Sequence, residues 1–121
     1  IDIRLTLMLR NIPKSANVTE LIHGLNHFIP GKFDFVYLRI DFKSGKNLGY
    51  AFVNLTNTDA LLALMDQEFG LVGRPWSTFM TADGHERRND AQMSYATTQG
   101  LDCLIEKFRN SSVMDEVWMY K

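Results

Sequence analysis

The sequence predicts an α+β domain in which a four-stranded antiparallel sheet carries two helices on one face and is followed by one further helix. Three observations support this prediction. Strand-like and helix-like apolar spacings follow one another in the order strand, helix, strand, strand, helix, strand, helix. Asn, Gly and Pro residues separate these segments. The chain has 121 residues, 45% of them hydrophobic, and a net charge of −1, which are the size and composition of one folded domain.

The first strand is expected over residues 5–10 and ends before Asn11-Ile12-Pro13. A helix follows, because apolar residues then recur at helical spacing. Asn17 and Glu20 are placed as a capping box at its start, and Pro30-Gly31 ends it. The apolar stripe of this helix consists of Val18, Leu21, Ile22, Leu25, Phe28 and Ile29.

Two long strands over residues 33–42 and 48–55 are expected to form a hairpin around the turn at 43–47. Alternating side chains of a strand point to opposite faces of a sheet. The face toward the core is predicted to hold Val36, Leu38, Ile40, Ala51, Val53 and Leu55, with Leu7 and Leu9 of the first strand. The opposite face is predicted to hold Phe35, Tyr37, Arg39, Asp41, Tyr50, Phe52 and Asn54, with Met8 and Arg10.

A second helix is expected to start near Thr56 and Asp59 and to end at Gly70. Its predicted apolar stripe consists of Leu61, Leu62, Met65 and Phe69. Residues 70–91 are less regular, and a connection of this length usually has structure or a function of its own. A short strand over 92–96 follows. A third helix is then expected over about 99–110, with an apolar stripe of Leu101, Leu104, Ile105 and Phe108.

This order of elements is that of a ferredoxin-like βαββαβ sandwich with an added C-terminal helix. Two helices cover only one face of such a sheet. The residues on the other face meet solvent, a partner or the added helix, and they therefore carry the functional information.

Composition excludes several classes of protein. The sequence contains no run of eighteen apolar residues that could span a membrane. The single Cys103 cannot form an internal disulfide, which favours an intracellular setting. The first residue is Ile1, so we expect one domain, residues 1–121, excerpted from a longer protein. The near-neutral total hides an asymmetry, since residues 1–55 carry seven basic and four acidic side chains and residues 56–121 carry six and ten. The basic half contains the predicted hairpin.

The predicted open face is aromatic and basic, which is unfavourable on a monomer unless something covers it. Flat rings stack on unpaired bases, and Lys or Arg side chains pair with phosphates. This combination predicts a surface for single-stranded nucleic acid.

Two segments then indicate a family. Residues 48–55, Leu-Gly-Tyr-Ala-Phe-Val-Asn-Leu, resemble the eight-residue RNP motif of RNA recognition motifs, and residues 7–12 resemble the six-residue partner motif. Tyr50 and Phe52 match the two stacking positions of the longer motif. Leu48, Leu55 and Met8 depart from the family pattern, the first from a basic residue and the others from aromatic ones.

More specifically, five stretches resemble the C-terminal RNA recognition motif of the Mei-two-like proteins. They are Asn11-Ile12-Pro13, residues 34–42, residues 49–54, residues 94–96 with Gln99-Gly100, and residues 108–116. Thr97-Thr98 and residues 14–17 depart from that pattern. The resemblance implies an RNA-binding regulator of meiosis or development that acts after transcription, in the nucleus and the cytoplasm.

The predicted RNA contacts follow from the residues and this resemblance together. Tyr50 and Phe52 stack bases, Tyr37 adds a third ring, and Arg10 and Arg39 bind phosphates or base edges. The complete set is Met8, Arg10, Phe35, Tyr37, Arg39, Lys43, Lys46, Tyr50, Phe52, Asn54 and Ser94. The predicted partner is single-stranded RNA, with protein partners in addition; the isolated domain is expected to be monomeric and to need no cofactor.

Alternative interpretations remain open at this point. The aromatic face is also consistent with a second hydrophobic layer beneath the third helix, and both interpretations hold if that helix moves aside for RNA. Residues 73–76, Gly-Arg-Pro-Trp, resemble the segment with which some domains of this fold bind Trp-containing peptides, so peptide binding through Arg74 and Trp76 is the second hypothesis.

Chemistry beyond binding has little support in the sequence. His23 and His27 have the i, i+4 spacing of metal ligands, with His85 as a third candidate, but no carboxylate or thiol cluster accompanies them. No Ser-His-Asp set, paired carboxylates or phosphate loop predicts an enzyme.

Overall fold

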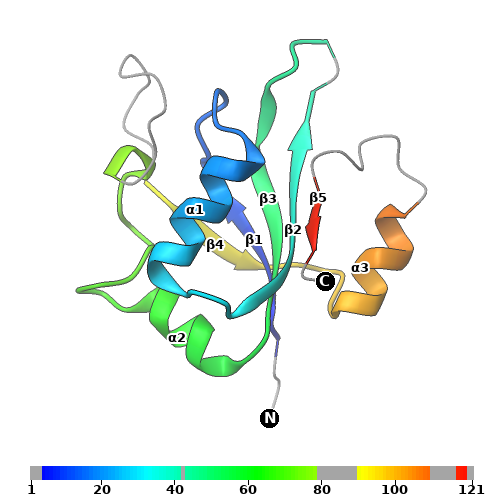
Figure 1. The fold of residues 1–121 in the computed structure, drawn as a ribbon. Coiled ribbons are helices and arrows are strands. Elements are labelled where there is room, and N and C mark those ends of the chain that lie inside the picture. Colours follow the sequence, from blue (N-terminus) through cyan, green and yellow to red (C-terminus); the bar gives the residue numbers. More distant parts are fainter. Residues whose placement is uncertain (1–3, 42, 79–89, 110–116, 120–121) are drawn as a thin grey trace.

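A computed structural model describes residues 4–41, 43–78, 90–109 and 117–119 of the chain (Figure 1). The strands are β1 (Thr6–Arg10), β2 (Phe33–Ile40), β3 (Asn47–Leu55), β4 (Gln92–Tyr95) and β5 (Val117–Met119). The helices are α1 (Val18–Phe28), α2 (Thr58–Met65) and α3 (Leu101–Phe108), with one 3₁₀ turn, η1 (Trp76–Thr78). All five strands form one antiparallel sheet in the order β4-β1-β3-β2-β5.

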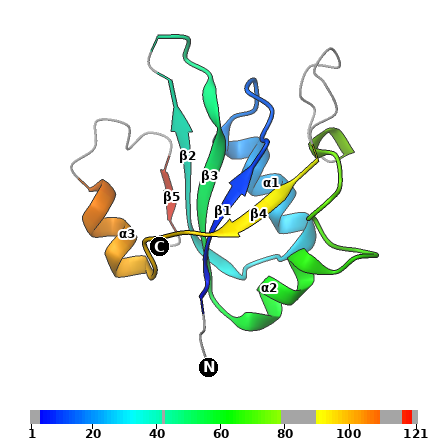
Figure 2. The ribbon, with the colours of Figure 1, turned by 180° about the vertical axis from the view of Figure 1, so that it is seen from behind.

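The predicted fold is confirmed, with one addition. The order βαββαβ followed by a helix is present, and a fifth strand, β5, extends the sheet beyond β2. Helices α1 and α2 pack on one face of the sheet and α3 lies on the other, as the two opposite views show (Figures 1 and 2). None of the helices in the described ranges is long and apolar enough to cross a membrane.

The main core lies between the sheet and α1 with α2. It contains the predicted inward residues of the strands, Leu7, Leu9, Val36, Leu38, Ala51, Val53 and Leu55. From α1 it takes Leu21 and Leu25, and Asn17 and Glu20 form the predicted capping box at the start of that helix. The alternation of the strands therefore assigned their core faces correctly.

The predicted apolar stripe of α2 is wrong for three of its four residues, because only Leu61 packs, partly buried, against the main core. This helix is capped by Asn57 instead of Thr56 and ends at Met65, because Asp66 takes an extended conformation there. Ala60 and Leu64 face the core, whereas Leu62, Met65 and Phe69 are exposed. Phe69 thus belongs to a turn beyond the helix and not to its buried side.

A bulge shifts the register between β2 and β3. Phe33 pairs with Leu55, but Phe35 pairs with Asn54, so the regular alternation is interrupted between them. Phe33 consequently lies in the main core while Phe35 lies on the opposite face, where the sequence had placed it.

Two residues, Asn47 and Gly49, fix the position of the start of β3. The amide of Asn47 donates to the carbonyl oxygens of Pro13 (2.7 Å) and Ala16 (2.9 Å), and its own oxygen accepts from the backbone N–H of Gly49 (2.7 Å). Gly49 has a φ of +94°, a conformation that favours glycine. Its carbonyl accepts from the backbone N–H of Ile12 (2.9 Å), which joins the two RNP-like segments.

Candidate nucleic-acid interface

The face of the sheet opposite α1 and α2 carries side chains in three parallel rows, which follow from the strand register. The first row contains Thr6, Asn54 and Phe35. The second contains Ser94, Met8, Phe52 and Tyr37. The third, called here the open row, contains Gln92, Arg10 and Tyr50, with Arg39 joined to it because its Nη1 donates to the Tyr50 hydroxyl at 3.2 Å.

Helix α3 covers much of the first two rows. Its buried side chains Leu104 and Phe108 form a second hydrophobic cluster with Phe35, Tyr37 and Phe52. The centre of the Phe108 ring lies 4.4 Å from the centre of the Tyr37 ring, which it meets edge to face, and 5.7 Å from the centre of the Phe52 ring. The Lys107 ammonium lies 5.9 Å from the centre of the Phe52 ring. Two of the three predicted stacking rings, Tyr37 and Phe52, are therefore covered in this structure, together with the predicted RNA contact Phe35.

A buried hydrogen-bond network ties the start of α3 to the sheet. The backbone N–H of Gly100 donates to the Thr6 hydroxyl (2.8 Å), which donates to the side-chain oxygen of Asn54 (2.6 Å). The Asn54 amide donates in turn to Asp34 (2.9 Å). Gln99 adds bonds to both the N–H and the carbonyl of Thr6. Asn54, predicted to read base edges, is thus committed to the attachment of α3 while the helix is docked.

The open row remains accessible beside α3. Arg10 and Arg39 are exposed and Tyr50 is half-buried between them. A hollow of about 430 Å³ lies at this end of the sheet, lined by Met8, Arg10, Asn11, Gly49, Tyr50 and Phe52. Sequence reasoning did not include Asn11 and Gly49, although both stand within or beside the RNP-like segments. Polar side chains and two aromatic residues, Tyr50 and Phe52, thus line the same hollow.

The β2–β3 turn presents the two predicted lysines to solvent. Asp41 organises this turn, because its carboxylate accepts from the backbone N–H of Lys43 (3.3 Å) and the hydroxyl of Ser44 (3.0 Å). Gly45 has a φ of +72°, which closes the turn without strain. Lys43 and Lys46 are both exposed at the tip of the hairpin, which extends beyond the sheet in Figure 1.

Ser94 lies next to Met8 in the second row. Its hydroxyl oxygen is buried and makes no hydrogen bond to the described part of the chain. A buried hydroxyl without a partner is unfavourable, and its role as a reader of bases stays a prediction.

The segment of the peptide-binding hypothesis has a structural role at Trp76. This side chain is fully buried in the main core, and its indole N–H donates to the carbonyl of Arg10 at 2.9 Å. It therefore holds the end of β1 and is not displayed for a ligand. Arg74 is half-buried at another surface, where its guanidinium donates to the carbonyls of Gly70 and Glu68.

The metal and thiol candidates gain no partners among the residues that the structure describes. His23 and His27 lie on the exposed side of α1, and no group of three His, Cys, Asp or Glu side chains within the described ranges is arranged for a metal ion. His85 lies outside those ranges. Cys103 is exposed on α3.

The fold and the paired strand motifs define an RNA recognition motif. The chain belongs to the RNA recognition motif 2 family, whose model matches residues 4–109. It is 40% identical over all 121 residues to "Meiosis protein mei2" of Schizosaccharomyces pombe and 38% identical over 115 residues to "Protein MEI2-like 4" of Oryza sativa subsp. japonica. These matches cover 100% and 95% of this chain but only 15% and 11% of the relatives, so the domain is of the Mei2 type and spans a small part of those proteins.

Solved structures confirm the fold. The "Structure of Rna15 RRM with bound RNA (GU)" aligns with a TM-score of 0.60 at 12% identity and covers 88% of this chain and 98% of that one. The RNA recognition domains of Sex-lethal from Drosophila melanogaster align with a TM-score of 0.54 at 24% identity, over 76% of this chain and 49% of that one.

Proposed function

We propose that this domain binds single-stranded RNA on the sheet face and contributes this activity to a regulator of meiosis or development. The observation that carries the proposal is the open row, in which Tyr50 stands between Arg10 and Arg39 at the edge of a hollow of about 430 Å³. The family match and the Mei2-type relatives support it, as does the RNA named for one structural neighbour.

RNA engages first where the surface is free. The open row offers one ring for stacking and two guanidinium groups for phosphates or base edges. Met8 lines the same hollow as Tyr50 and provides an apolar wall for a base. Lys43 and Lys46 bind the backbone of the RNA where it passes the hairpin, because both ammonium groups are exposed there.

The remaining rings become available when α3 leaves the sheet. Tyr37 and Phe52 are 2% and 9% exposed, so no base can stack on either face while Phe108 covers them. Displacing α3 exposes these rings together with Phe35, Asn54 and Ser94. RNA that stacks on the released rings shifts the equilibrium toward the open state, since it binds that state more tightly than the docked state.

Replacing Tyr50 by alanine tests the proposal. Loss of one stacked base is expected to weaken RNA binding by about 1–3 kcal/mol. Fluorescence anisotropy with a short, randomised single-stranded RNA measures this loss. Tyr95→Ala is the matched control, because Tyr95 is also an exposed tyrosine of the sheet but sits on edge strand β4, opposite Leu7 in the register.

Two results bear on the proposal directly. Chemical shifts of the Arg10, Arg39 and Tyr50 amides that move on addition of RNA support it. Unchanged affinity of the Tyr50→Ala variant, in a domain that is still folded, refutes the open row as the binding surface.

A further inference from the structure

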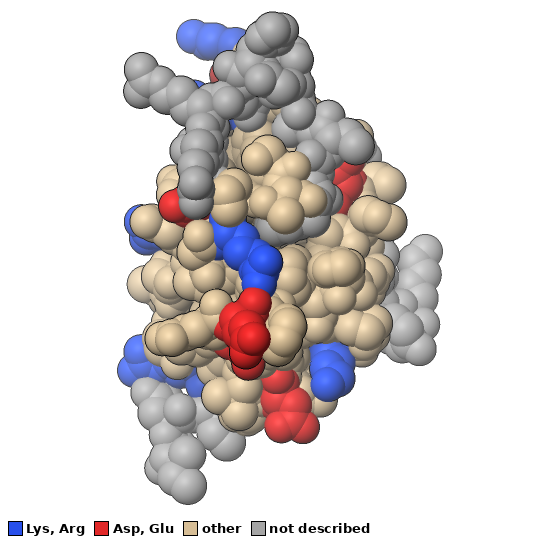
Figure 3. Space-filling model, turned by 90° about the vertical axis from the view of Figure 1, so that its left-hand side faces the viewer, with Lys and Arg blue, Asp and Glu red and all other residues tan. Residues whose placement is uncertain are grey.

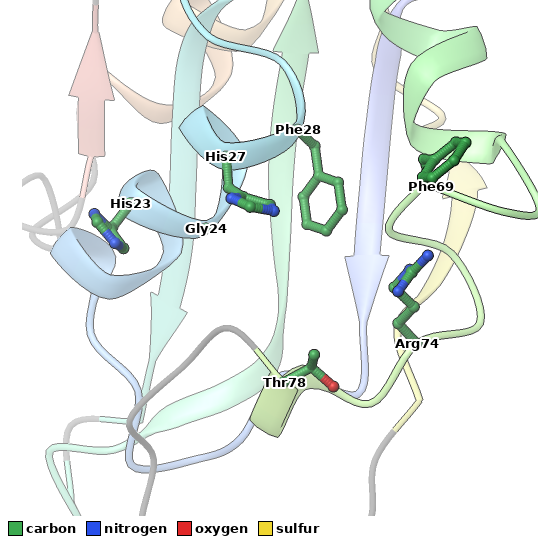
Figure 4. A pocket seen from close by; sticks show the side chains of 7 residues that line it. All are labelled: His23, Gly24, His27, Phe28, Phe69, Arg74 and Thr78. Atoms are coloured by element: carbon green, nitrogen blue, oxygen red, sulfur yellow. The ribbon is translucent and has the colours of Figure 1, made fainter.

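The face formed by α1, α2 and the segment after α2 has a pocket that the proposed RNA surface does not use. It holds about 380 Å³ and is lined by His23, Gly24, His27 and Phe28 of α1, and by Phe69, Arg74 and Thr78. Figure 4 shows the rings of His27 and Phe28 on one side of this hollow and Phe69 with the Arg74 guanidinium on the other. In the described part of this face, residues other than Lys, Arg, Asp and Glu predominate, with a basic and an acidic group side by side near its centre (Figure 3).

Four apolar side chains of α2 and of the segment after it are exposed instead of being buried, and one of them, Phe69, lines the pocket. Phe69 is 72% exposed, Leu62 62% and Met65 52%, and Val72 is also exposed. We call these four residues the apolar shelf. Leu62 and Met65 share one side of α2 at i, i+3 spacing, and Phe69 and Val72 follow the helix. Exposed apolar surface of this kind usually marks a contact with another molecule.

The turn that displays Phe69 is held by several hydrogen bonds. The Asp66 carboxylate accepts from the backbone N–H groups of Glu68 (2.9 Å) and Phe69 (2.8 Å), and the N–H of Gly70 donates to the Asp66 carbonyl (2.8 Å). A Cβ on Gly70 would lie 2.4 Å from that carbonyl oxygen, so only glycine allows this close approach. The ring is therefore held out to solvent by a fixed backbone, which lowers the entropic cost of binding.

Arg74 gives the pocket its charge. Two of its five N–H groups donate to the carbonyls of Gly70 and Glu68, which fix the plane of the guanidinium and leave the others available to a ligand. The Asp66 carboxylate lies near enough to offset part of the positive potential of Arg74, but none of the residues that line the pocket is acidic. His23 and His27 add imidazole groups, which also donate hydrogen bonds to carboxylates.

We infer that this pocket binds an acidic peptide segment of a partner protein through one large aromatic side chain. The volume is at the lower end of the range for ligand sites and suits a single ring. The walls of Phe28 and Phe69 contact this ring, the apolar shelf extends the contact, and Arg74 pairs with a carboxylate of the peptide. The site lies on the opposite face of the sheet from the open row, so the domain binds RNA and this peptide at the same time.

The inference is tested by NMR titration of the chain with three heptapeptides: tryptophan flanked by glutamates, the same peptide with alanine for tryptophan, and the same peptide with lysines for the glutamates. The first is expected to move the amides of Gly24, Phe69 and Arg74 and to saturate. The alanine and lysine peptides are each expected to bind about tenfold more weakly or worse, because each lacks one of the two recognition elements.

Two protein variants sharpen the test. Phe69→Ser is expected to weaken binding of the tryptophan peptide about tenfold or more, without unfolding, because the ring is mostly exposed. Ile105→Ser is the control, since Ile105 is exposed on α3 at the other side of the sheet. Saturation of the domain with RNA is expected to leave the affinity for the peptide unchanged, which separates this site from the proposed RNA surface.

Three outcomes overturn the inference. They are the absence of any shift in the pocket at millimolar tryptophan peptide, equal binding of the alanine or lysine peptide, and shifts confined to Arg10, Tyr50 and their neighbours on the sheet. None of these outcomes refutes RNA binding, which is measured separately.

Discussion

Replacing Phe108 by alanine is expected to tighten RNA binding, although the substitution removes a buried side chain. Phe108 is 8% exposed and packs on both Tyr37 and Phe52. Its ring covers Tyr37 and Phe52, which we propose for base stacking. Its removal loosens α3 and leaves the main core on the other side of the sheet intact.

The structure sets the size of this effect. Truncating a buried Phe to Ala costs about 3–5 kcal/mol in a closed core, and the lower value applies here because α3 is exposed to solvent on its outer side. A destabilisation of about 3 kcal/mol in the docked state alone raises the population of the open state by about 100-fold, as long as that state remains the minor one. Apparent RNA affinity rises by at most this factor, because the docked state also binds RNA through the open row.

Two measurements on the same samples are needed. Fluorescence anisotropy with a short single-stranded RNA gives the affinity, and hydrogen exchange of the α3 amides reports how far the helix has opened. Ile105→Ala is the matched control on the same helix, since Ile105 is 36% exposed and belongs to neither hydrophobic cluster. The affinity of the Ile105→Ala variant for RNA should stay within about twofold of that of the unchanged domain.

The refuting result is specific. If exchange shows that α3 has opened in Phe108→Ala and RNA affinity is unchanged or lower, the covered rings do not contribute to binding. The open row would then be the whole RNA surface, and α3 would be a structural part of it.

Three further predictions concern the hairpin, the start of β3 and the turn after α2. Changing Lys43 and Lys46 together to glutamine should make the negative slope of log affinity against log salt concentration shallower by about 1.4, because each phosphate contact on single strands contributes about 0.7. An unchanged slope in a salt titration would exclude both lysines from the interface. Asn47→Ala should lower the free energy of unfolding by about 2–4 kcal/mol in a urea titration, since three hydrogen-bonded groups lose their partner. Backbone N–H groups, that of Phe69 first, hold the pKa of Asp66 below its ordinary value of 3.8, so the turn keeps this stabilisation at neutral pH and loses it as the pH falls through the lowered pKa. The amide shift of Phe69 should report this transition in an acid titration, and Asp66→Asn should remove it.

The structure also changes what is expected of Phe52. From the sequence, this ring is an exposed stacking residue whose loss costs RNA binding and little stability. In the folded domain it is 9% exposed, with Phe108 at 5.7 Å and Tyr37 at 6.5 Å between ring centres. Phe52→Ala removes a stacking surface and loosens α3 at once, so its effects on RNA affinity oppose each other. Tyr50 packs only at the edge of this cluster, with its ring centre 6.0 Å from that of Phe52, and is the cleaner probe.

The two faces of the domain differ in how their apolar residues are used. On the α3 face, the aromatic side chains are covered by a helix that is attached through one hydrogen-bonded corner at Thr6, Asn54 and Gly100. On the α1–α2 face, apolar residues after the helix remain uncovered. The first arrangement suits a surface that opens for a ligand, and the second suits a surface that is permanently available.

Much of the fold was predictable because local rules govern it. Alternation identified the core sides of β1, β2 and β3, and the Asn17–Glu20 pair identified the start of α1. The stripe of α2 was not predictable in this way. Four apolar residues at helical spacing indicated a buried side, but the helix ends before the last of them. Ala60 and Leu64 are the buried residues, and of the predicted four only Leu61 packs beside them.

For the candidate site, too, local sequence rules predicted one part and the tertiary structure decided the other. The sequence by itself determined the fold class, the family and the identity of the aromatic and basic residues on the outer face, because strand period and the RNP-like segments are local properties of the chain. Only the tertiary structure decided which of them are accessible. Whether Tyr37 or Tyr50 meets solvent depends on where α3 docks, and docking is set by contacts between residues more than fifty positions apart, which no local pattern records.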